Sequence, residues 1–477
     1  MLYDKRPLDT GEHIFSSIPY QAIIAQNEPQ GHYMRALNDL QGVLDSQQLT
    51  DRNNAIANIV TTPDFHAGKP VPVGVVIDTQ HVLMPHLIGN DIGCGMRMVV
   101  IDNVSPDELS PELDVHLRHI LFQGGRNIAL SGRNRQAILR HSILGLLDSF
   151  KAGRQGLLAD INIAAAWHDA NHQGDYGHFS ANAIIDDFAD YGKGFDEFRH
   201  DAILGTIGGG NHFVEFGFVS NIVDRQFAHA AGLKSNSLVI IIHSGSLDFG
   251  QRVGSILRDK MHKNTVHNNG FNVEDNSSLV QFCINGYANA INIAFANRFL
   301  IGLSAIKALQ RVIKREVEHH LVYDVAHNGI WYEDGVYRHR KGACPARGGD
   351  IMAGSAYHWL GEPVILPGSM GDGSWLLKGL GNRQWSQSSA HGAGRHLSRS
   401  EARKTAPLNT KLRVVTPVAY ATTHLCGRMD IQKELQDRLR EEAPAAYRPI
   451  EDVVEPMVKA KMVEKVAKIK PILTVKG

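Results

Sequence analysis

Short apolar, β-branched runs alternate along the chain with longer segments that have helical periodicity. Runs with the length and residue types of strands occupy residues 73–78, 238–243, 321–325, 363–366 and 412–415. Helical spacing is clearest at residues 430–442 and at residues 305–320, where one face carries Ile306, Leu309, Val312, Ile313 and Val317. The pattern predicts a fold of the mixed α/β (α+β) class.

Two segments interrupt this alternation. Residues 168–200 are rich in His, Asp and Gly, and residues 260–277 are rich in Asn. Both are expected to form irregular surface loops or insertions. A chain of 477 residues has room for about three domains of ordinary size, but no internal repeat and no Pro/Ser-rich boundary divides it. We interpret residues 1–477 as a single domain with insertions.

Composition and charge limit the partners and the cellular location that are expected for the protein. Lys plus Arg and Asp plus Glu number 49 each, so any contact with nucleic acid has to come from a local basic patch. The four cysteines lie far apart without a C-x-x-C pair, and the N-terminus lacks an apolar signal core, which favours a reducing, cytoplasmic location. No run approaches the ~18 apolar residues of a membrane span, so no membrane partner is expected.

Candidate chemistry is concentrated in glycine-rich turns. The 46 glycines exceed the usual share of about 7%, and many of them flank polar residues. In the segment Asp91-Ile92-Gly93-Cys94-Gly95 a cysteine follows a carboxylate by three residues. His212, His243 and His327 each lie at the end of an apolar run or in a glycine-rich turn, where side chains can converge on a pocket.

These residue types suit a metal site. A thiolate, a carboxylate and several imidazoles can hold one or two divalent ions, and a cysteine sulfur can bridge two of them. An isolated histidine more often has a structural role, and most of the 25 histidines must have one. On the residues alone, a metal site and ordinary structural histidines both remain open.

A second kind of chemistry is indicated around His391. In Ala390-His391-Gly392-Ala393-Gly394-Arg395 the glycines allow the backbone to approach a phosphate closely, and Arg395 and Arg399 add positive charge. A neutral imidazole nitrogen placed there can attack phosphorus and form a phosphoramidate. A structural histidine in a phosphate-binding loop fits the same residues. The chain has neither a G-x-x-x-x-G-K-[ST] loop nor a K-x-D-G segment, so nucleotidylation would need a nucleophile other than the lysine of classical ligases.

In order and wording, these segments resemble the RtcB family of RNA ligases. The resemblance runs from about residue 60 to the end of the chain and also includes Pro63–Gly68, Gly205–Gly208, Lys341–Ala343, Pro367–Gly371 and Val475–Gly477. It implies one catalytic domain with central β-sheets flanked by helices, and a ligase that uses GTP and two Mn²⁺ ions. Such an enzyme joins RNA 3′-phosphate or 2′,3′-cyclic phosphate ends to 5′-hydroxyl ends through a GMP-histidine intermediate, in RNA repair or tRNA splicing. Whether a helper such as archease is needed stays open.

The resemblance also implies roles for individual residues. Cys94, His243 and His327 would hold one ion and Asp91, Cys94 and His212 the second, while His391 would carry GMP. The nucleotide would be bound by Asn211, Phe213, Glu215, Asn328, Ser369, Ser374, Gly392, Ala393, Gly394, Tyr447 and Lys476. RNA ends would be held by Lys341, Arg395 and Arg399. Read without the family, Glu215 merely ends a strand, Tyr447 packs at a helix end and Lys476 belongs to a solvated tail.

One departure from the family pattern affects the RNA-end half. Family members usually continue the H-[ST]-G-S segment with Arg-Gly, whereas this chain has Leu247-Asp248. We therefore expect a divergent member with a narrower or different broken-RNA substrate, such as nicked tRNA or ribosomal RNA. Two other readings remain. The His168-Asp169 pair and the H-x-S segments at His178 and His396 fit a metal-dependent RNA phosphodiesterase, and the missing arginine fits a catalytically silent RNA-binding scaffold.

Overall fold

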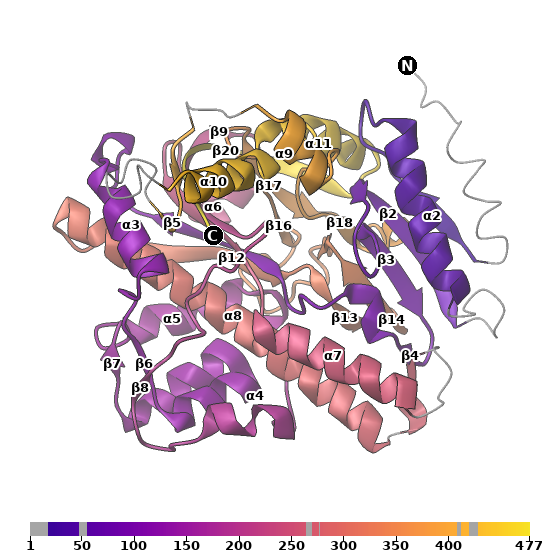
Figure 1. The fold of residues 1–477 in the computed structure, drawn as a ribbon, viewed down its shortest axis with the longest axis horizontal. Coiled ribbons are helices and arrows are strands. Elements are labelled where there is room, and N and C mark those ends of the chain that lie inside the picture. Colours follow the sequence, from indigo (N-terminus) through magenta and orange to yellow (C-terminus); the bar gives the residue numbers. More distant parts are fainter. Residues whose placement is uncertain (1–17, 47–54, 264–269, 276, 408–411, 419–427) are drawn as a thin grey trace.

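Two β-sheets form the frame of the protein (Figure 1). The computed structural model describes residues 18–46, 55–263, 270–275, 277–407, 412–418 and 428–477. The smaller sheet has the order β1 (Tyr20–Ala22), β2 (Ile56–His66), β3 (Val73–Thr79), β14 (Val336–Lys341) and β13 (Asn328–Glu333). The larger sheet has the order β12 (His319–Ala326), β5 (Gly95–Ile101), β10 (Leu238–Ser244), β9 (Phe213–Ile222), β20 (Val463–Lys476), β17 (Ser374–Gly379) and β16 (Pro363–Leu366). The short β19 (Val414–Val415) runs parallel to β20. The predicted mixed α/β class is confirmed.

Helices cover the outer faces of these sheets, with a long helix crossing the larger one (Figure 1). They are α2 (Gln30–Ser46), α3 (Glu112–Phe122), α4 (Gly132–Ser149), α5 (Ile163–Asp169), α6 (Arg225–Ala230), α7 (Asp248–Lys263), α8 (Ser278–Ile313), α9 (Arg399–Thr405), α10 (Met429–Glu441) and α11 (Ile450–Lys459). Shorter strands are β4 (Val82–Leu83), β6 (Ile128–Leu130), β7 (Gln155–Gly156), β8 (Arg199–His200), β11 (Phe271–Asn272), β15 (Ala343–Pro345) and β18 (Ser388–Ala390).

Helix α8 lies between two large buried clusters, one shared with the larger sheet and one with other helices. Helix α8 packs together with α3 against β10, β5 and β12 on one side, and against α4 and α7 on the other. Ile240 and Ile242 of β10 share a buried cluster with Ile301 of α8, and each such side chain contributes about 1.5–3 kcal/mol when fully buried. Gly302 lets the helix come close, because a Cβ there would lie 3.2 Å from the Cδ1 of Ile242. By length and composition α8 is also long enough to cross a membrane, but 94% of its most apolar window is buried inside the protein.

Most predicted elements are found where the pattern placed them. Strands β3, β10, β12 and β16 and helix α10 match their predicted ranges to within two residues, while β19 is shorter than the predicted 412–415. The predicted helix at 305–320 is wrong in its second half. Helix α8 ends at Ile313 because Lys314 adopts a left-handed conformation with φ 57°, and from His319 the chain pairs with β5 instead. Pairing with a buried strand outweighs the helical spacing of Val317.

The two predicted irregular segments have different structures. Within 168–200 the chain forms the end of α5, a series of 3₁₀ turns, among them η4 (Ala170–His172), and the short β8. Within 260–277, α7 continues to Lys263 and the chain then forms β11 and a 3₁₀ turn at Val273–Asp275. Residues 264–269 and 276 lie outside the described residues, as does Cys426.

Candidate active site

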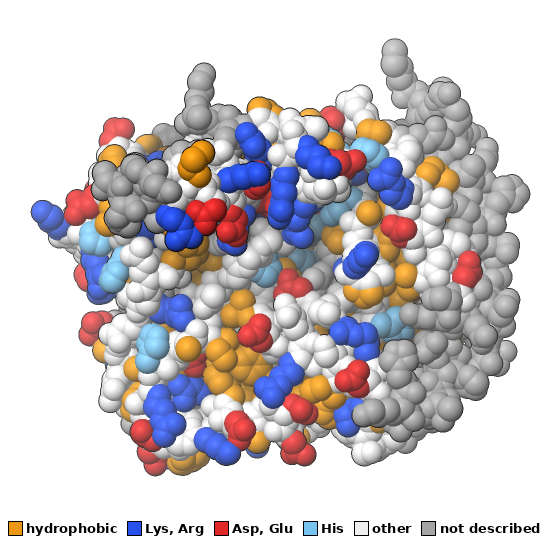
Figure 2. Space-filling view, viewed as in Figure 1, with side chains coloured by type: hydrophobic (Ala, Val, Ile, Leu, Met, Phe, Trp, Pro, Cys, Tyr) orange, Lys and Arg blue, Asp and Glu red, His pale blue; other side chains and the backbone are white. Residues whose placement is uncertain are grey.

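The candidate residues meet around a cavity of about 600 Å³ between the two sheets and α9. Of the predicted metal ligands, Asp91, Cys94, His243 and His327 line it, and His391 does too. Basic side chains gather over α9 and α10 above a hollow in which histidines are visible (Figure 2). Segments that are hundreds of residues apart in the sequence therefore form one site.

Strand register explains why these residues converge. Strand β5 is antiparallel to both β10 and β12, so its first residue, Gly95, pairs with Ser244 and with Ala326 at their last residues. Cys94 precedes the start of β5, while His243 and His327 lie at the ends of the two neighbouring strands. In β9, Phe213 pairs with His243, which brings His212 to the same edge. Backbone pairing thus brings donors at the strand ends to one edge of the sheet.

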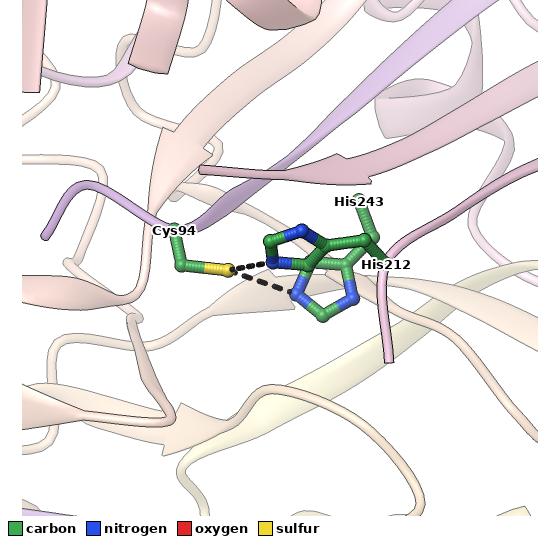
Figure 3. A group of neighbouring side chains, drawn as sticks. All are labelled: Cys94, His212 and His243. Carbon is green, nitrogen blue, oxygen red and sulfur yellow. Dashed lines mark hydrogen bonds between the residues drawn. The ribbon is translucent and has the colours of Figure 1, made fainter. Parts of the chain in front are cut away.

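Three of the donors are in direct contact (Figure 3). The Sγ of Cys94 lies 3.3 Å from Nε2 of His212 and 3.1 Å from Nε2 of His243. The Nδ1 atoms of the two histidines face the backbone carbonyls of Ile207 and Asn211, each at 3.1 Å. With Nδ1 held by a carbonyl, each ring presents Nε2 as the coordinating nitrogen.

The two other predicted ligands lie on either side of this group. The Oδ2 atom of Asp91 lies 2.9 Å from Nε2 of His212. The His327 ring lies 5.1 Å from the His243 ring between centroids, and its Nδ1 is buried with no hydrogen-bond partner among the described residues. Gly245 makes room for the carboxylate, because a Cβ there would collide with Asp91. All five predicted ligands therefore lie together.

The protonation of these groups suits a divalent cation. Burial, reinforced by the neighbouring histidines, holds the pKa values of His243 and His327 well below the usual value, so both rings are neutral. Burial and the nearby Asp91 raise the pKa of the Cys94 thiol. A bound cation would reverse that shift by stabilising the thiolate. Neutral imidazoles, an unpartnered ring nitrogen, a thiol and a carboxylate fit one or two metal ions.

A buried arginine that the sequence analysis did not single out holds the backbone next to Cys94 and His243. Arg298 of α8 is fully buried, and its NH1 donates to the carbonyls of Gly93 at 2.7 Å and Ser244 at 3.0 Å. These carbonyls belong to the residues next to Cys94 and His243. Its Nε donates to Asp324 at 2.7 Å. One guanidinium therefore fixes the spacing of two backbone segments that carry donors.

His391 is oriented by a carboxylate that sequence reasoning missed. Its Nδ1 lies 2.6 Å from Oδ2 of the buried Asp64, and the same oxygen accepts the His391 backbone N–H at 3.1 Å. Thr62 donates to the other carboxylate oxygen at 2.6 Å. Although burial opposes it, the contact with His391 lowers the pKa of Asp64 below its usual value. A carboxylate on Nδ1 leaves the lone pair of Nε2 free. Asp64 lies inside the Pro63–Gly68 segment, so a signal for it was present.

The predicted nucleotide contacts surround the same cavity. Its lining includes Asn211, Phe213, Glu215, Asn328, Ser369, Gly392, Ala393, Gly394, Tyr447 and Lys476. Ser374 lies just behind it and donates to Oε1 of Glu215 at 3.2 Å. Burial raises the pKa of Glu215 to about 7, although hydrogen bonds from Ser374 and Thr474 oppose the shift. Glu215 is thus a buried carboxyl group in mid-strand, and not a strand end.

Glu442 joins several of the predicted residues. It accepts from Lys476 at 3.2 Å and from Arg395 at 3.2 Å, and it pairs closely with the Tyr447 hydroxyl. Although burial alone would raise it, Lys476 and Arg395 lower the pKa of Glu442. Lys476 is buried within this network, so the solvated-tail reading of its side chain is wrong.

The residues predicted to hold RNA ends differ in how free they are. Arg395 donates to Glu442, Tyr447 and backbone carbonyls. The Nζ of Lys341 donates to the carbonyls of Lys69, at 3.1 Å, and Val71, and burial lowers its pKa to about 8. Arg399 is about half exposed, and its Nε lies 3.9 Å from Glu441 and from Glu442. Arg399 is therefore the most available of the three.

Helix α2 lines one side of the cavity mouth, which no sequence motif indicated. His32 and Arg35 of α2 line it opposite α9. Arg35 is exposed and makes no hydrogen bond or ion pair with the residues that the structure describes. Glu28, just before α2, pairs with the buried Arg448, which also donates to the Phe65 carbonyl at 3.1 Å. These contacts hold the start of α2 beside the cavity.

The structure also shows where Leu247, which departs from the family pattern, and the histidines of the phosphodiesterase reading lie. Leu247, where the family usually has arginine, has φ 54° and lies at the turn into α7. Its side chain packs close to Gly208, where an added Cβ would lie 3.3 Å from Cδ2 of Leu247. His396 lines the cavity, whereas His178 contacts His141 and His168 contacts His172. The two H-x-S segments therefore do not meet in one cleft, as a two-histidine phosphoesterase would require.

Comparison with known proteins gives the family. Residues 47–477 match the family model described as tRNA-splicing ligase RtcB. The chain belongs to the RtcB family. A tRNA-splicing ligase RtcB from Nanoarchaeum equitans is 31% identical over 451 residues, which cover 88% of each chain. An RNA-splicing ligase RtcB2 from Escherichia coli is 30% identical over 467 residues, covering 94% of this chain and 98% of the relative. The RtcB resemblance expected from the sequence is confirmed, and the family match begins after α2.

Proposed function

We propose that the protein is an RNA ligase that joins RNA 3′-phosphate or 2′,3′-cyclic phosphate ends to 5′-hydroxyl ends at the expense of GTP. The observation that carries the proposal is the position of His391. Its Nδ1 is held by Asp64 at 2.6 Å, and its ring lies 4.7 Å from that of His327 between centroids. An imidazole that can act as a nucleophile therefore lies beside a metal-type donor set in one cavity, which supports the proposal.

His391 would carry the nucleotide through the reaction. Its Nε2 attacks the α-phosphorus of GTP, so an N–P bond forms and the bond to the β-phosphate oxygen breaks, with pyrophosphate leaving. An oxygen of the RNA 3′-phosphate then attacks the same phosphorus and releases His391. Finally, the 5′-hydroxyl attacks the activated RNA phosphate and GMP leaves; a 2′,3′-cyclic end is first opened by water. Throughout, Asp64 keeps the proton on Nδ1.

Two groups of side chains would hold divalent ions, for which we propose Mn²⁺. One group is Cys94, His243 and His327, and the other is Asp91, Cys94 and His212. When bound, such ions neutralise phosphate charge and help orient attacking oxygens. The protein's own contribution is to hold the donors at the strand ends and, through Arg298, to keep their backbone segments at a fixed spacing.

Guanine selection would rest on Glu215. A carboxylate can accept hydrogen bonds from two N–H groups on one edge of guanine, whereas adenine offers no such pair. Ser374 supports the carboxyl group, and Tyr447 and Phe213 supply ring faces in the cavity. The side chains of Arg399 and Arg35 at the mouth, with Lys341 deeper inside, would meet RNA phosphates.

The decisive experiment is incubation with α-labelled GTP and Mn²⁺, followed by denaturing electrophoresis and an acid-lability test. We expect an acid-labile label with GTP, none with labelled ATP, and none in His391→Ala. A His391→Ala protein that still becomes labelled would overturn the assignment. Absence of label in a protein that opens cyclic phosphates would instead favour the phosphodiesterase reading.

The substrate range is proposed to be narrower than that of a general splicing ligase. Leu247 removes a guanidinium from the turn next to His212, so the grip on an RNA end differs from that of arginine-bearing members. Ligation rates on tRNA halves, nicked tRNA and nicked ribosomal RNA would measure this. Equal rates on all of them would contradict a specialised role.

A further inference from the structure

A second cluster of metal-type donors lies on α5 and η4. The ligand atoms of His168, Asp169 and His172 all lie within 4.8 Å of one another. His168 and His172 are four residues apart, and their ring centroids are separated by 5.5 Å. Residues four apart in a helical segment lie on one face, which lets two imidazoles chelate one ion. None of the three lines the cavity that contains His391.

His172 is the buried member of this cluster. It is 9% exposed, and its Nδ1 has no hydrogen-bond partner among the residues that the structure describes. A buried ring without its full set of partners is unfavourable unless another group supplies them.

Asp169 links the cluster to the larger sheet. Its Oδ1 accepts the backbone N–H of Leu321 in β12 at 3.1 Å, and Gln173 forms a bridge with Asp324 of the same strand. His168, by contrast, is exposed to solvent. An ion can therefore enter from the His168 side, and water can complete its coordination.

We propose that His168, Asp169 and His172 form a further site for a divalent transition metal of the zinc class, which links α5 to η4 beside β12. Two imidazoles and a carboxylate suit Zn²⁺, and Co²⁺ and Ni²⁺ accept the same donors. The site is separate from the donors proposed for ligation and contains no thiol. We assign this site a structural role, because Asp169 contacts β12 and β12 leads directly to His327.

Co²⁺ distinguishes the two sites by spectroscopy. Coordination by the Cys94 thiolate gives a near-ultraviolet charge-transfer band, whereas nitrogen and oxygen donors give only weak visible bands. Metal-free full-length protein is titrated with Co²⁺ in the wild type and in His168→Ala. We expect His168→Ala to bind one Co²⁺ fewer per chain with the thiolate band unchanged. Equal stoichiometry in the two proteins would overturn the proposal.

Two further variants control for folding and for surface binding. His229 is an exposed histidine in the last turn of the short helix α6, as His168 is in α5, so His229→Ala should bind Co²⁺ as the wild type does. Loss of an ion in that variant would show general histidine binding and reject the site. In a Cys94→Ala background, Co²⁺ should still raise the melting temperature, and adding His168→Ala should remove that increase. No increase in the Cys94→Ala protein would also reject the site. Neither readout depends on GTP or on ligation.

Discussion

The floor and the mouth of the cavity are built in different ways. At the floor, Cys94, His212 and His243 lie at the ends of paired strands, and their positions follow from the register of the sheet. At the mouth, Arg35 and Arg399 project from helices α2 and α9 and are exposed. The floor carries the groups proposed for metal and nucleotide chemistry, and the mouth carries those proposed for RNA.

This difference bears on how each half tolerates change. A donor at a strand end cannot move without disturbing backbone pairing on both sides, and Arg298 ties the same segments together from α8. An arginine at the mouth can be exchanged at little structural cost. The departure from the family at Leu247 lies near the floor donors but in the turn that leads to a helix. Substitutions in the floor should therefore stop the reaction, and those at the mouth should alter its substrates.

The largest expected effect is in the floor. Cys94→Ala removes the donor that contacts both His212 and His243, so Mn²⁺ binding in the cavity and covalent GMP capture should both fall below detection. Calorimetry with Mn²⁺ and labelling with GTP measure the two. Cys283→Ala, which alters a buried free cysteine in α8, should leave both unchanged. If Cys94→Ala were labelled by GTP as fully as the wild type, the proposed difference between the floor and the mouth of the cavity would be wrong.

Asp64→Asn tests orientation rather than metal binding. An amide can present its N–H to Nδ1 of His391 and so favour the wrong tautomer, and we expect covalent capture to slow by about 10–100-fold. The KM for GTP and the affinity for Mn²⁺ should stay near the wild-type values, because Asp64 contacts neither the predicted metal ligands nor Glu215. A parallel loss of Mn²⁺ affinity would show a general structural defect instead.

Glu215 should give the nucleotide pocket a pH dependence. Its pKa of about 7 is raised from the usual value, so the protonated form predominates below pH 7 and the carboxylate above it. If the carboxylate accepts guanine N–H groups, guanosine affinity without metal should rise about tenfold between pH 6 and pH 8. The same ionisation costs folding stability as pH rises through the folded-state pKa. Glu215→Gln should bind guanosine weakly and with no such rise; a persisting rise would assign it to another group.

The smallest effect is expected at the mouth. Arg399→Ala should weaken RNA binding only a few-fold and lower the salt dependence by about one phosphate contact, with GMP capture unchanged. Fluorescence anisotropy at several salt concentrations provides the measurement. Lys404→Ala is the matched control, because Lys404 is exposed on the same helix but does not line the cavity. A loss of GMP capture in Arg399→Ala would mean that floor and mouth are not separable.

Much of the site could be predicted from short sequence motifs, because turns that carry reactive or ligating residues have an unusual composition. The segments around Cys94 and His391 combine glycine with a nucleophilic or ligating residue, and both meet in the cavity. Asp64 was quoted in its motif but not given a role, since nothing local indicates that it faces His391. Arg298 had no signal at all: in the sequence it is one basic residue in an apolar helix, and its partners are more than 25 residues away.

The sequence by itself determined the class of fold, strands β3, β10, β12 and β16, and the kinds of donor available. These depend on periodicity and residue type, which act over a few neighbouring positions. The tertiary structure decided which donors meet, because long-range pairing of β5 with β10 and β12 brings together residues that no local rule connects. It also ended α8 at Ile313, buried Lys476 beside Glu442, and left Arg395 engaged while Arg399 stayed exposed. Such outcomes depend on burial and charge partners, which exist only once the chain is folded.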